Sequence, residues 1–541
     1  MRQVLLSCAA LLGCVGLLSE AHGEGPSCEG LAQLALPGAK IASAQAIAAG
    51  AFTPPPNLPA WLVGDPAAYK ALPAFCRVVA ESRPSADSDI GIEVWMPLAG
   101  WNGRFRGQGN GGFAGQIDYR GLAAAAGAGY ATAGTDTGHS GAPIDATWAL
   151  GHPEKVIDFG WRAVHEMTRA AKAVIQSYYG KRPAHSYFAS CSNGGRQALM
   201  EAQRFPEDYD GILAGAPANF WTHLLTGALS DAQATTLDEG SYIPSGKLPA
   251  IARAVDAACD AQDGVADGIL DDPRRCRFDP ASMLCKDGDS AACLTAPQVT
   301  ALGKLYAGAR HADGRRIFPG FLPGAEEGEG GWATWITGSA PGKNLLFAFA
   351  NGFFADMVYE KADWDYKTAD LSQAVKAADE KTARTLNATD PDLRRFKDRG
   401  GKLILYHGWN DPAISALNTV DYYQSVRSAM RPGAVDPFLR LYMVPGVQHC
   451  GDGPGPSSFG QGGSTGPADH RHSLQLALEE WVEKGTGPSA IIATRYAEAS
   501  PGTSKGAAVK MTRPLCPYPG TAAYRGAGDP NDAASFTCVA R

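Results

Sequence analysis

The sequence predicts an α/β sheet with crossover helices that is split by a large inserted domain. Between residues 85 and 215, short apolar strands alternate with a clear helix, and the same pattern resumes at residue 402. The intervening residues contain four cysteines and a cluster of tryptophan and phenylalanine at 332–364, and we expect loops to dominate there. The expected parts are a signal peptide at 1–23, a first part of the core at 24–218, the inserted domain at 219–389 and a second part of the core at 390–541.

Local patterns define the individual elements. In the helix expected at 161–179, apolar residues recur at spacings of three and four and therefore lie on one face. The expected strands are short apolar runs. They span 92–96, 130–134, 186–189, 211–214, 402–406 and 439–444, and further helices are expected at 196–204, 418–429 and 474–482.

Composition excludes several classes of protein. The chain has 541 residues, of which 45% are hydrophobic and 19% charged, so it is neither disordered nor a coiled coil. With 48 Lys+Arg against 55 Asp+Glu the net charge is −7, and no basic run could follow a phosphate backbone. We therefore expect no nucleic-acid partner, and the sequence leaves the oligomeric state open.

The N-terminus has the features of a secretory signal peptide. Met1-Arg2 is a positive start, residues 4–18 are apolar, and Ala21-His22-Gly23 fits a cleavage site. A lipoprotein signal at Cys14 is the alternative, although the apolar run continues beyond it. No other segment reaches the length of a membrane span. We expect a secreted or periplasmic protein, with lipoprotein anchoring as the alternative.

The cysteine count is typical of an exported protein. Removal of the signal peptide leaves ten cysteines, an even number that predicts five disulfides. No C-x-x-C pair is present, so a zinc site is disfavoured. Spacing favours local pairs but does not fix connectivity: Cys28 with Cys76, Cys259 with Cys276, Cys285 with Cys293 and Cys516 with Cys538, which leaves Cys191 and Cys450.

The strongest local motif lies at residues 190–195. An apolar strand enters Ser190-Cys191-Ser192-Asn193-Gly194-Gly195 and a helix leaves it, which is the context of a nucleophile elbow. Ser190 stands where such elbows usually have glycine. Ser140 lies in a similar motif, but Pro143 follows where a helix should begin. We therefore expect Ser192 to be the nucleophile.

A serine nucleophile needs a histidine base and an acid that orients it. Asp411 follows the strand at 402–406, and His449 follows the strand at 439–444, in the chain order Ser, acid, His that α/β-hydrolases use. His407 is a rival base, but it precedes Asp411 in the same loop. We expect His449 to act as the base.

Two cysteines adjoin the proposed nucleophile and base. Cys191 immediately precedes Ser192, and Cys450 immediately follows His449. A disulfide between these cysteines would hold their Cα atoms about 5.5 Å apart. The alternative is that the bond merely closes a large loop. We expect it to hold nucleophile and base together.

Acyl transfer also needs donors for the oxyanion. The backbone amide of Asn193, at the start of a helix, is the first candidate. Gly112 is the second, in the glycine-rich turn at 109–112. These glycines could instead form a simple turn, and no G-x-x-x-x-G-K pattern supports a phosphate site.

An acidic loop at 260–269 has the residues of a calcium site. Asp260, Asp263 and Asp267 offer hard oxygen ligands, and the carbonyls of Val265 and Ile269 could complete the shell. The loop is not an EF-hand, because the glutamate at position 12 is missing. From the residues alone, a solvated acidic loop closed by a disulfide is an equal alternative.

Together these motifs resemble the tannase and feruloyl esterase family. The resemblance includes its CS-D-HC motif and extends over essentially the whole mature chain. The matching residues are Cys191-Ser192, Asp411 and His449-Cys450, with 101–105, 215–217, 406–408, 513–519 and the calcium loop.

This resemblance implies an α/β-hydrolase core with an inserted lid domain and the five disulfides paired as above. It also implies a structural Ca²⁺ in the lid, with Asp260, Asp263, Val265, Asp267 and Ile269 as ligands. The implied substrates are small aromatic esters, feruloyl or galloyl. The lid contains an aromatic cluster that could hold the ring, and a role as simple lid core is the alternative. We expect one or two of its members to contact substrate, with Trp332, Trp335 and Phe353 as the first candidates and Phe347, Phe349 and Phe354 as the others.

Other activities remain open. Terephthalate monoester hydrolysis also occurs in the family, where a lid arginine holds the free carboxylate of the substrate. The stretch at 332–364 contains Lys343 but no arginine, which disfavours that activity. An amidase or peptidase would use the same triad, and a phenolic- or glycan-binding relative without catalysis is a further alternative.

Overall fold

The computed structural model describes residues 26–56, 58–328, 330–461, 469–497 and 507–540. The expected signal peptide lies outside these residues. Within the described part of the chain, no helix has both the length and the apolar character needed to cross a bilayer.

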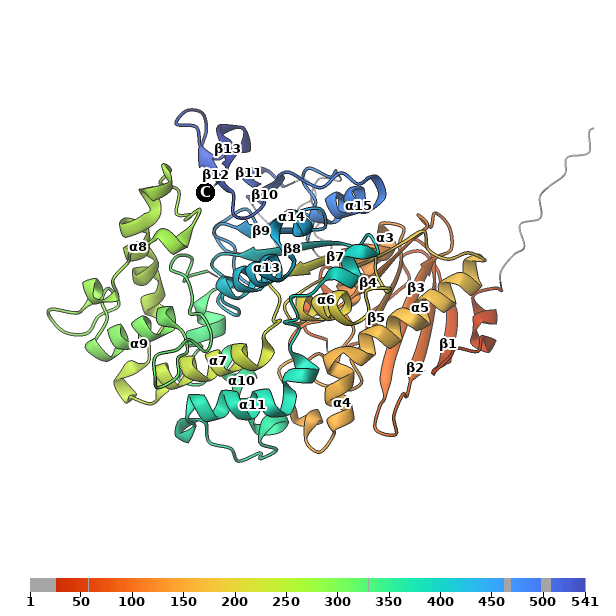
Figure 1. Ribbon diagram of the computed structural model, residues 1–541, viewed down its shortest axis with the longest axis horizontal. Coiled ribbons are helices and arrows are strands. Elements are labelled where there is room, and N and C mark those ends of the chain that lie inside the picture. The colour runs from red at the N-terminus through yellow and green to blue at the C-terminus, as the bar shows by residue number, and fades with distance from the viewer. Residues whose placement is uncertain (1–25, 57, 329, 462–468, 498–506, 541) are drawn as a thin grey trace, which may run out of the picture.

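The core is a nine-stranded sheet whose order is β1-β2-β3-β5-β4-β6-β7-β8-β9 (Figure 1). The β1–β2, β2–β3 and β3–β5 pairs are antiparallel, and the pairs from β5–β4 onward to β8–β9 are parallel. The strands are β1 Ala39–Ile47, β2 Phe75–Ser82, β3 Ile90–Pro97, β4 Arg104–Gln108, β5 Ala131–Thr135, β6 His185–Cys191, β7 Gly211–Gly215, β8 Lys402–Gly408 and β9 Leu439–Val444. All six predicted strands are present, whereas β1, β2 and β4 are additional.

Helices cover both faces of this sheet. Alternate residues of β8 join different cores, because successive side chains of a strand point to opposite faces: Leu403 and Leu405 pack with residues of α5, α6 and α13, and Ile404 packs with residues of α15. The helices of the core are α1 Ala60–Val63, α2 Pro66–Lys70, α3 Tyr119–Gly127, α4 Pro153–Ile157, α5 Ala163–Tyr179, α6 Asn193–Arg204, α13 Ala416–Met430, α14 Pro432–Val435 and α15 Leu474–Lys484.

The segment between β7 and β8 contains several helices that the sequence did not predict, together with the expected loops, as at 261–295 and 308–328, which have no α-helix. Its first long helix is buried at eleven positions, including both polar and apolar ones, and therefore lacks the apolar stripe by which an amphipathic helix is recognised. Figure 1 shows these helices as a body beside the sheet. They are α7 Trp221–Thr236, α8 Leu248–Cys259, α9 Ala296–Ala307, α10 Leu345–Gly352, α11 Leu371–Leu386 and α12 Arg394–Asp398.

The inserted helices share a hydrophobic core with the first part of the chain. Phe113, Ala146 and Phe159 pack in the same cluster as residues of α7, α10 and α11. The insertion is thus joined to the sheet domain through a continuous apolar interface rather than through its two connections alone.

Five disulfides connect the ten cysteines, and all five predicted pairs are confirmed. They are Cys28–Cys76, Cys191–Cys450, Cys259–Cys276, Cys285–Cys293 and Cys516–Cys538. The last pair lies in a C-terminal region of two small antiparallel sheets outside the main sheet, β10 Ile491–Tyr496 with β11 Val509–Leu515 and β12 Thr521–Tyr524 with β13 Phe536–Val539.

Candidate active site

Ser192 lies at the sharp turn between β6 and α6. Its backbone has φ 67° and ψ −126°, a conformation that is costly for a non-glycine residue. Two close approaches make this turn possible: a β-carbon at Gly194 would lie 1.8 Å from Ser190 Oγ, and one at Gly195 would lie 2.2 Å from the carbonyl oxygen of Gly215. The strand-turn-helix geometry of a nucleophile elbow is therefore present, with Ser190 in the position that usually holds glycine.

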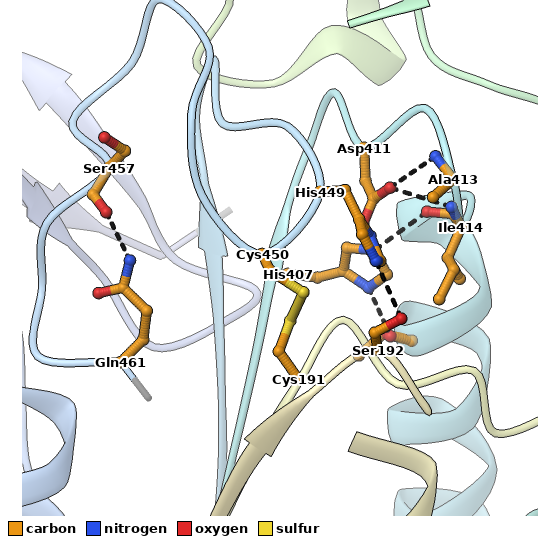
Figure 2. Close-up of a disulfide and its surroundings, with 11 residues drawn as sticks. Cys191, Ser192, His407, Asp411, Ala413, Ile414, His449, Cys450, Ser457 and Gln461 are labelled. Carbon is orange, nitrogen blue, oxygen red and sulfur yellow. Dashed lines mark hydrogen bonds and ion pairs between the residues drawn. A yellow bond between two sulfur atoms is a disulfide. The ribbon is translucent and has the colours of Figure 1, made fainter. Parts of the chain in front are cut away.

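His449 and Asp411 form a hydrogen-bond chain with Ser192 (Figure 2). His449 Nδ1 lies 2.8 Å from Asp411 Oδ2, and His449 Nε2 lies 2.9 Å from Ser192 Oγ. Because the carboxylate can only accept, Nδ1 of the neutral ring carries the proton and Nε2 is free to accept from the serine hydroxyl. The three residues come from the ends of β6, β8 and β9.

Asp411 is fully buried and is held by four donors. Its Oδ1 accepts from the backbone amides of Ala413 and Ile414 at 2.8 and 3.0 Å. Burial by itself would raise the pKa of Asp411, but the charge of His449 and the hydrogen bonds from His407 and His449 outweigh burial and hold the pKa well below its usual range. Asp411 is therefore an ionised acceptor over the working range of pH.

His407, the rival base, is fully buried and its ring nitrogens are occupied. Nε2 lies 3.0 Å from the carbonyl oxygen of Ile414 and 3.1 Å from Asp411 Oδ2, so it must donate. Nδ1 lies 2.7 Å from Thr419 Oγ1 and accepts from that hydroxyl. His407 thus orients Asp411 and has no nitrogen left to serve as a base.

The disulfide Cys191–Cys450 connects the two loops that carry Ser192 and His449 (Figure 2). Its Cα atoms are 5.9 Å apart, close to the separation expected from the sequence. The neighbours of the serine and the histidine are therefore covalently fixed to each other.

A second connection fixes the loop of His449. Gln448 Nε2 donates to the carbonyls of Ala325 and Glu327 at 2.7 and 2.8 Å, which ties this loop to the insertion. Between them Glu326 is fully buried, and its Oε1 accepts from Tyr306 and from the amide of Gly324. Burial raises the pKa of Glu326 to about 7.

The two expected oxyanion donors lie on segments that pack together. The amide of Asn193 is in the first turn of α6, where amides have no acceptor within the helix. Gly112 has φ 57°, and a β-carbon there would lie 2.3 Å from the carbonyl oxygen of Pro143. Asn110, in the same glycine turn, exchanges two hydrogen bonds with Gln197 of α6, which fixes the turn against the elbow.

Arg196 is an element of the site that the sequence reasoning missed. Its guanidinium is fully buried and donates to Asn193 Oδ1 at 2.8 Å and to the carbonyls of Gly160, Phe159 and Leu386 at 2.8, 3.0 and 3.4 Å. It also packs against the rings of Phe159 and Trp221, 4.8 and 5.1 Å from their centroids. Burial lowers its pKa to about 9. The sequence could have indicated a role for Arg196, because this residue directly follows the two glycines of the elbow.

The aromatic residues expected to bind substrate lie in different environments. Trp335 is half-buried and its ring meets His449 edge-on at 4.8 Å, with Phe349 stacked behind it at 6.3 Å. Trp332 and Phe353 are 1% and 0% exposed and pack inside the core of the insertion, so the structure does not support direct contact with substrate for these two. Trp61, which was not predicted, is half-exposed and lies against Gly111 of the oxyanion turn.

Ser140, the alternative nucleophile, is an exposed loop residue. It follows β5, but the next residues form bends and turns rather than a helix. Its neighbour His139 is buried and lies 2.9 Å from the carbonyl oxygen of Phe113, so this histidine supports the loop after Gly112 instead of facing Ser140.

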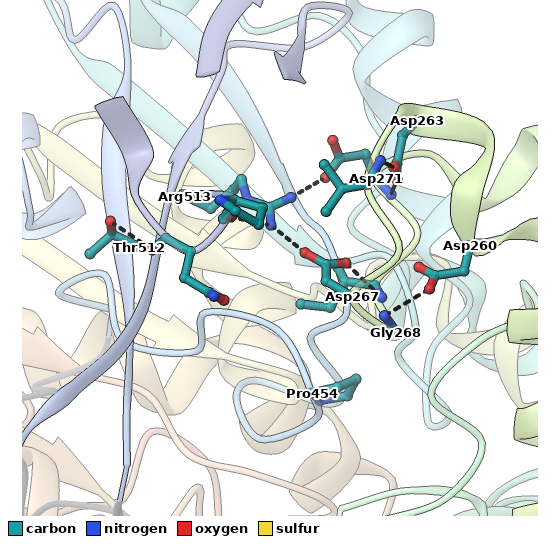
Figure 3. A network of polar contacts seen from close by, with 12 residues as sticks. Asp260, Asp263, Asp267, Gly268, Asp271, Pro454, Thr512 and Arg513 are labelled. Atoms are coloured by element: carbon teal, nitrogen blue, oxygen red, sulfur yellow. Dashed lines mark hydrogen bonds and ion pairs between the residues drawn. The ribbon is translucent and has the colours of Figure 1, made fainter. Parts of the chain in front are cut away.

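The acidic loop at 260–269 is closed by Cys259–Cys276, and the arginine Arg513 from β11 reaches it (Figure 3). Arg513 binds Asp267 at 2.7 Å and Asp271 at 3.0 Å. Asp260 Oδ1 is buried without a hydrogen-bond partner among the described residues, and burial raises the pKa of Asp263. An unpaired buried oxygen beside several carboxylates fits a hard cation such as Ca²⁺.

Comparisons with known proteins agree with this geometry. Residues 76–539 match the family described as "Tannase and feruloyl esterase". An uncharacterized esterase of Xanthomonas campestris pv. campestris is 42% identical over 98% of this chain and 94% of its own length. The mono(2-hydroxyethyl) terephthalate hydrolase of Piscinibacter sakaiensis is 34% identical over 89% of this chain and 88% of its own. The crystal structure of feruloyl esterase B from Aspergillus oryzae is 29% identical, covers 95% of this chain and 99% of its own, and superposes with a TM-score of 0.84. The chain therefore belongs to the tannase and feruloyl esterase family of carboxylic ester hydrolases.

Proposed function

We propose that the chain hydrolyses esters of phenolic acids, feruloyl or galloyl, through an acyl-enzyme formed on Ser192. The observation that carries the proposal is the continuous hydrogen-bond chain from Ser192 through His449 to Asp411 at an elbow. This arrangement supplies a nucleophile, a base and an orienting acid in the geometry that acyl transfer needs.

In the first step Ser192 Oγ attacks the ester carbonyl while His449 Nε2 takes the hydroxyl proton. Asp411 keeps the imidazole in the required tautomer and stabilises the imidazolium that forms. The amides of Asn193 and Gly112 donate to the oxyanion, and His449 then protonates the departing alcohol. In the second step a water molecule, deprotonated by His449, attacks the acyl-enzyme and releases the acid.

The aromatic surroundings support an aromatic acyl group. Trp335 is partly exposed next to His449, and Trp61 covers Gly111 at the other donor loop. Aromatic rings stack or meet edge-on with gains of about 1 kcal/mol beyond burial. An aromatic acyl group bound at Ser192 would have Trp335 as a neighbour, because Trp335 meets His449, the partner of Ser192. Relatives named feruloyl esterase B share the fold.

The test compares initial rates on methyl ferulate, methyl gallate and mono(2-hydroxyethyl) terephthalate. Ser192→Ala should abolish turnover, whereas Ser140→Ala, the matched control in the exposed loop, should keep the wild-type rate. Whichever of the ferulate and the gallate is hydrolysed faster identifies the acid part of the preferred ester. Cleavage of the terephthalate monoester alone would contradict the phenolic assignment, and the absence of any hydrolysis of all three esters by the wild type would indicate a binding protein.

We also propose that the loop at 260–269 holds a structural Ca²⁺. Asp260, Asp263 and Asp267 would supply carboxylate oxygens, and Val265 and Ile269 would supply carbonyls. The ion would neutralise the carboxylates and stabilise the connection between the insertion and β11. None of these five residues belongs to the triad, so the ion would be structural and would take no part in the chemistry.

Export from the cytoplasm is the third part of the proposal. Five disulfides favour an oxidising compartment, and the N-terminal residues 1–23 have the pattern of a signal peptide. Fractionation of expressing cells, with a Cys14→Ala variant to test lipid anchoring, would distinguish medium, periplasm and membrane.

A further inference from the structure

A second polar cluster lies on the face of the sheet covered by α5 and α6, apart from the triad. His165 comes from α5, Glu201 from α6 and Asp208 from the loop before β7 (Figure 1). One ligand atom from each of the three side chains lies within 4.8 Å of the others. Glu201 is nine residues along α6 from Ser192, which corresponds to about 13 Å of helix. The esterase mechanism does not use this cluster.

Glu201 is the central observation. The residue is 1% exposed, and neither oxygen of its carboxylate receives a hydrogen bond from an N–H or hydroxyl donor within the described ranges. The carboxylate of Asp208, itself 5% exposed, is its neighbour. Burial and the charge of Asp208 raise the pKa of Glu201 well above its usual value. Two buried carboxylates in contact require either a shared proton or a cation between them.

Among the described residues, no Lys or Arg forms an ion pair with either carboxylate. Lys172 donates to the backbone carbonyl of Asp208 rather than to either carboxylate. His165 Nδ1 lies 2.6 Å from Asp208 Oδ2, and its ring is held by stacking on Phe205 at 3.8 Å. The side chain of His165 is 20% exposed, which gives an ion a way in from solvent.

We propose that His165 Nδ1, Glu201 and Asp208 form a binding site for a transition-metal ion such as Zn²⁺. One imidazole nitrogen and two carboxylates are a donor set that suits Zn²⁺ and differs from the all-oxygen loop at 260–269. The bound ion would connect α5, α6 and the loop before β7. Because α6 begins directly after Ser192, the ion would act structurally, by holding the helix that carries the elbow.

The test uses Co²⁺ as a visible probe in the full chain, first treated with a chelator and then resupplied with Ca²⁺. Co²⁺ bound by nitrogen and oxygen ligands absorbs in the visible range, and we expect one equivalent that Zn²⁺ displaces. His165→Gln and Glu201→Gln should each weaken Co²⁺ binding at least tenfold. His223→Gln is the matched control, because His223 also pairs with an aspartate, Asp379, at similar exposure but without a second carboxylate.

The outcomes separate the alternatives. Absence of the absorption band, or a band of equal strength in both Gln variants, would overturn the proposal and leave a proton shared by Glu201 and Asp208. Circular dichroism of each variant shows whether a lost band reflects misfolding. Because the readout is Co²⁺ absorption, it is independent of whether phenolic esters are the substrates.

Discussion

Replacement of Cys191 and Cys450 by alanine tests whether the disulfide beside the site acts on catalysis as well as on stability. The bond closes a loop with a sequence separation of 259 residues, and the chain-entropy relation then gives a contribution of about 5.6 kcal/mol to the free energy of unfolding. The same bond holds the neighbours of Ser192 and His449. A displacement of these loops by about 1 Å would lower kcat/KM about 100-fold.

The assay combines urea unfolding, followed by tryptophan fluorescence, with initial rates on the preferred ester. Cys285 and Cys293 provide the control, because their sequence separation is 8 residues and the same relation gives about 2.5 kcal/mol. Their replacement should lower stability and leave kcat/KM unchanged. If the Cys191/Cys450 variant loses stability but retains the wild-type kcat/KM below its unfolding transition, the bond does not position the catalytic groups and the reasoning is wrong.

Three further predictions concern single side chains. Asp411→Asn should place a donor opposite His449 Nδ1, force the wrong tautomer and lower kcat about 10⁴-fold, with an unchanged circular dichroism spectrum; a smaller loss than tenfold would contradict the assigned role. Glu326 is protonated in the folded protein up to a pKa of about 7, against about 4.5 when unfolded, so the wild type should lose about 3 kcal/mol of stability as pH rises from 4 to 8. Glu326→Gln should show a flatter profile of unfolding free energy against pH. An unchanged slope would show that titration of Glu326 is not the cause of the pH dependence. Ca²⁺ should raise the unfolding temperature of chelator-treated wild type but not of Asp260→Asn, and an equal rise in both would exclude the loop as the site.

The sequence was most informative where strands are continuous apolar runs. The apolar runs of β6 to β9 were recognised because both faces are covered, whereas β1 was missed because it is an edge strand and most of its residues are exposed. In the inserted domain, α7 is buried around much of its circumference and therefore shows little periodicity. β4 was missed although it is mostly buried, because Arg104, Arg106 and Gln108 make its sequence largely polar.

In the active site, too, some residues could be predicted from the sequence and others could not. Ser192, Asp411 and His449 were chosen from their chain order and neighbours, and the structure brings them within hydrogen-bond distance. Arg196 was missed because a charged residue in a helix is usually exposed, and only the packed structure shows that carbonyls and aromatic rings enclose it. Composition likewise shows that aromatic residues cluster, but it does not show which ring reaches the serine.

The contacts of Arg196 bear on how substrates enter. This side chain ties the helix after the nucleophile to Leu386 near the end of the insertion, while Trp221 near its start packs on the guanidinium. Arg196 thereby connects both ends of the insertion to the helix that follows Ser192. We therefore expect that the insertion does not open and close as a mobile lid. Selection among esters would then rest on how the acyl group fits beside fixed side chains such as Trp335, and a poor substrate would be rejected by misfit rather than by slow opening.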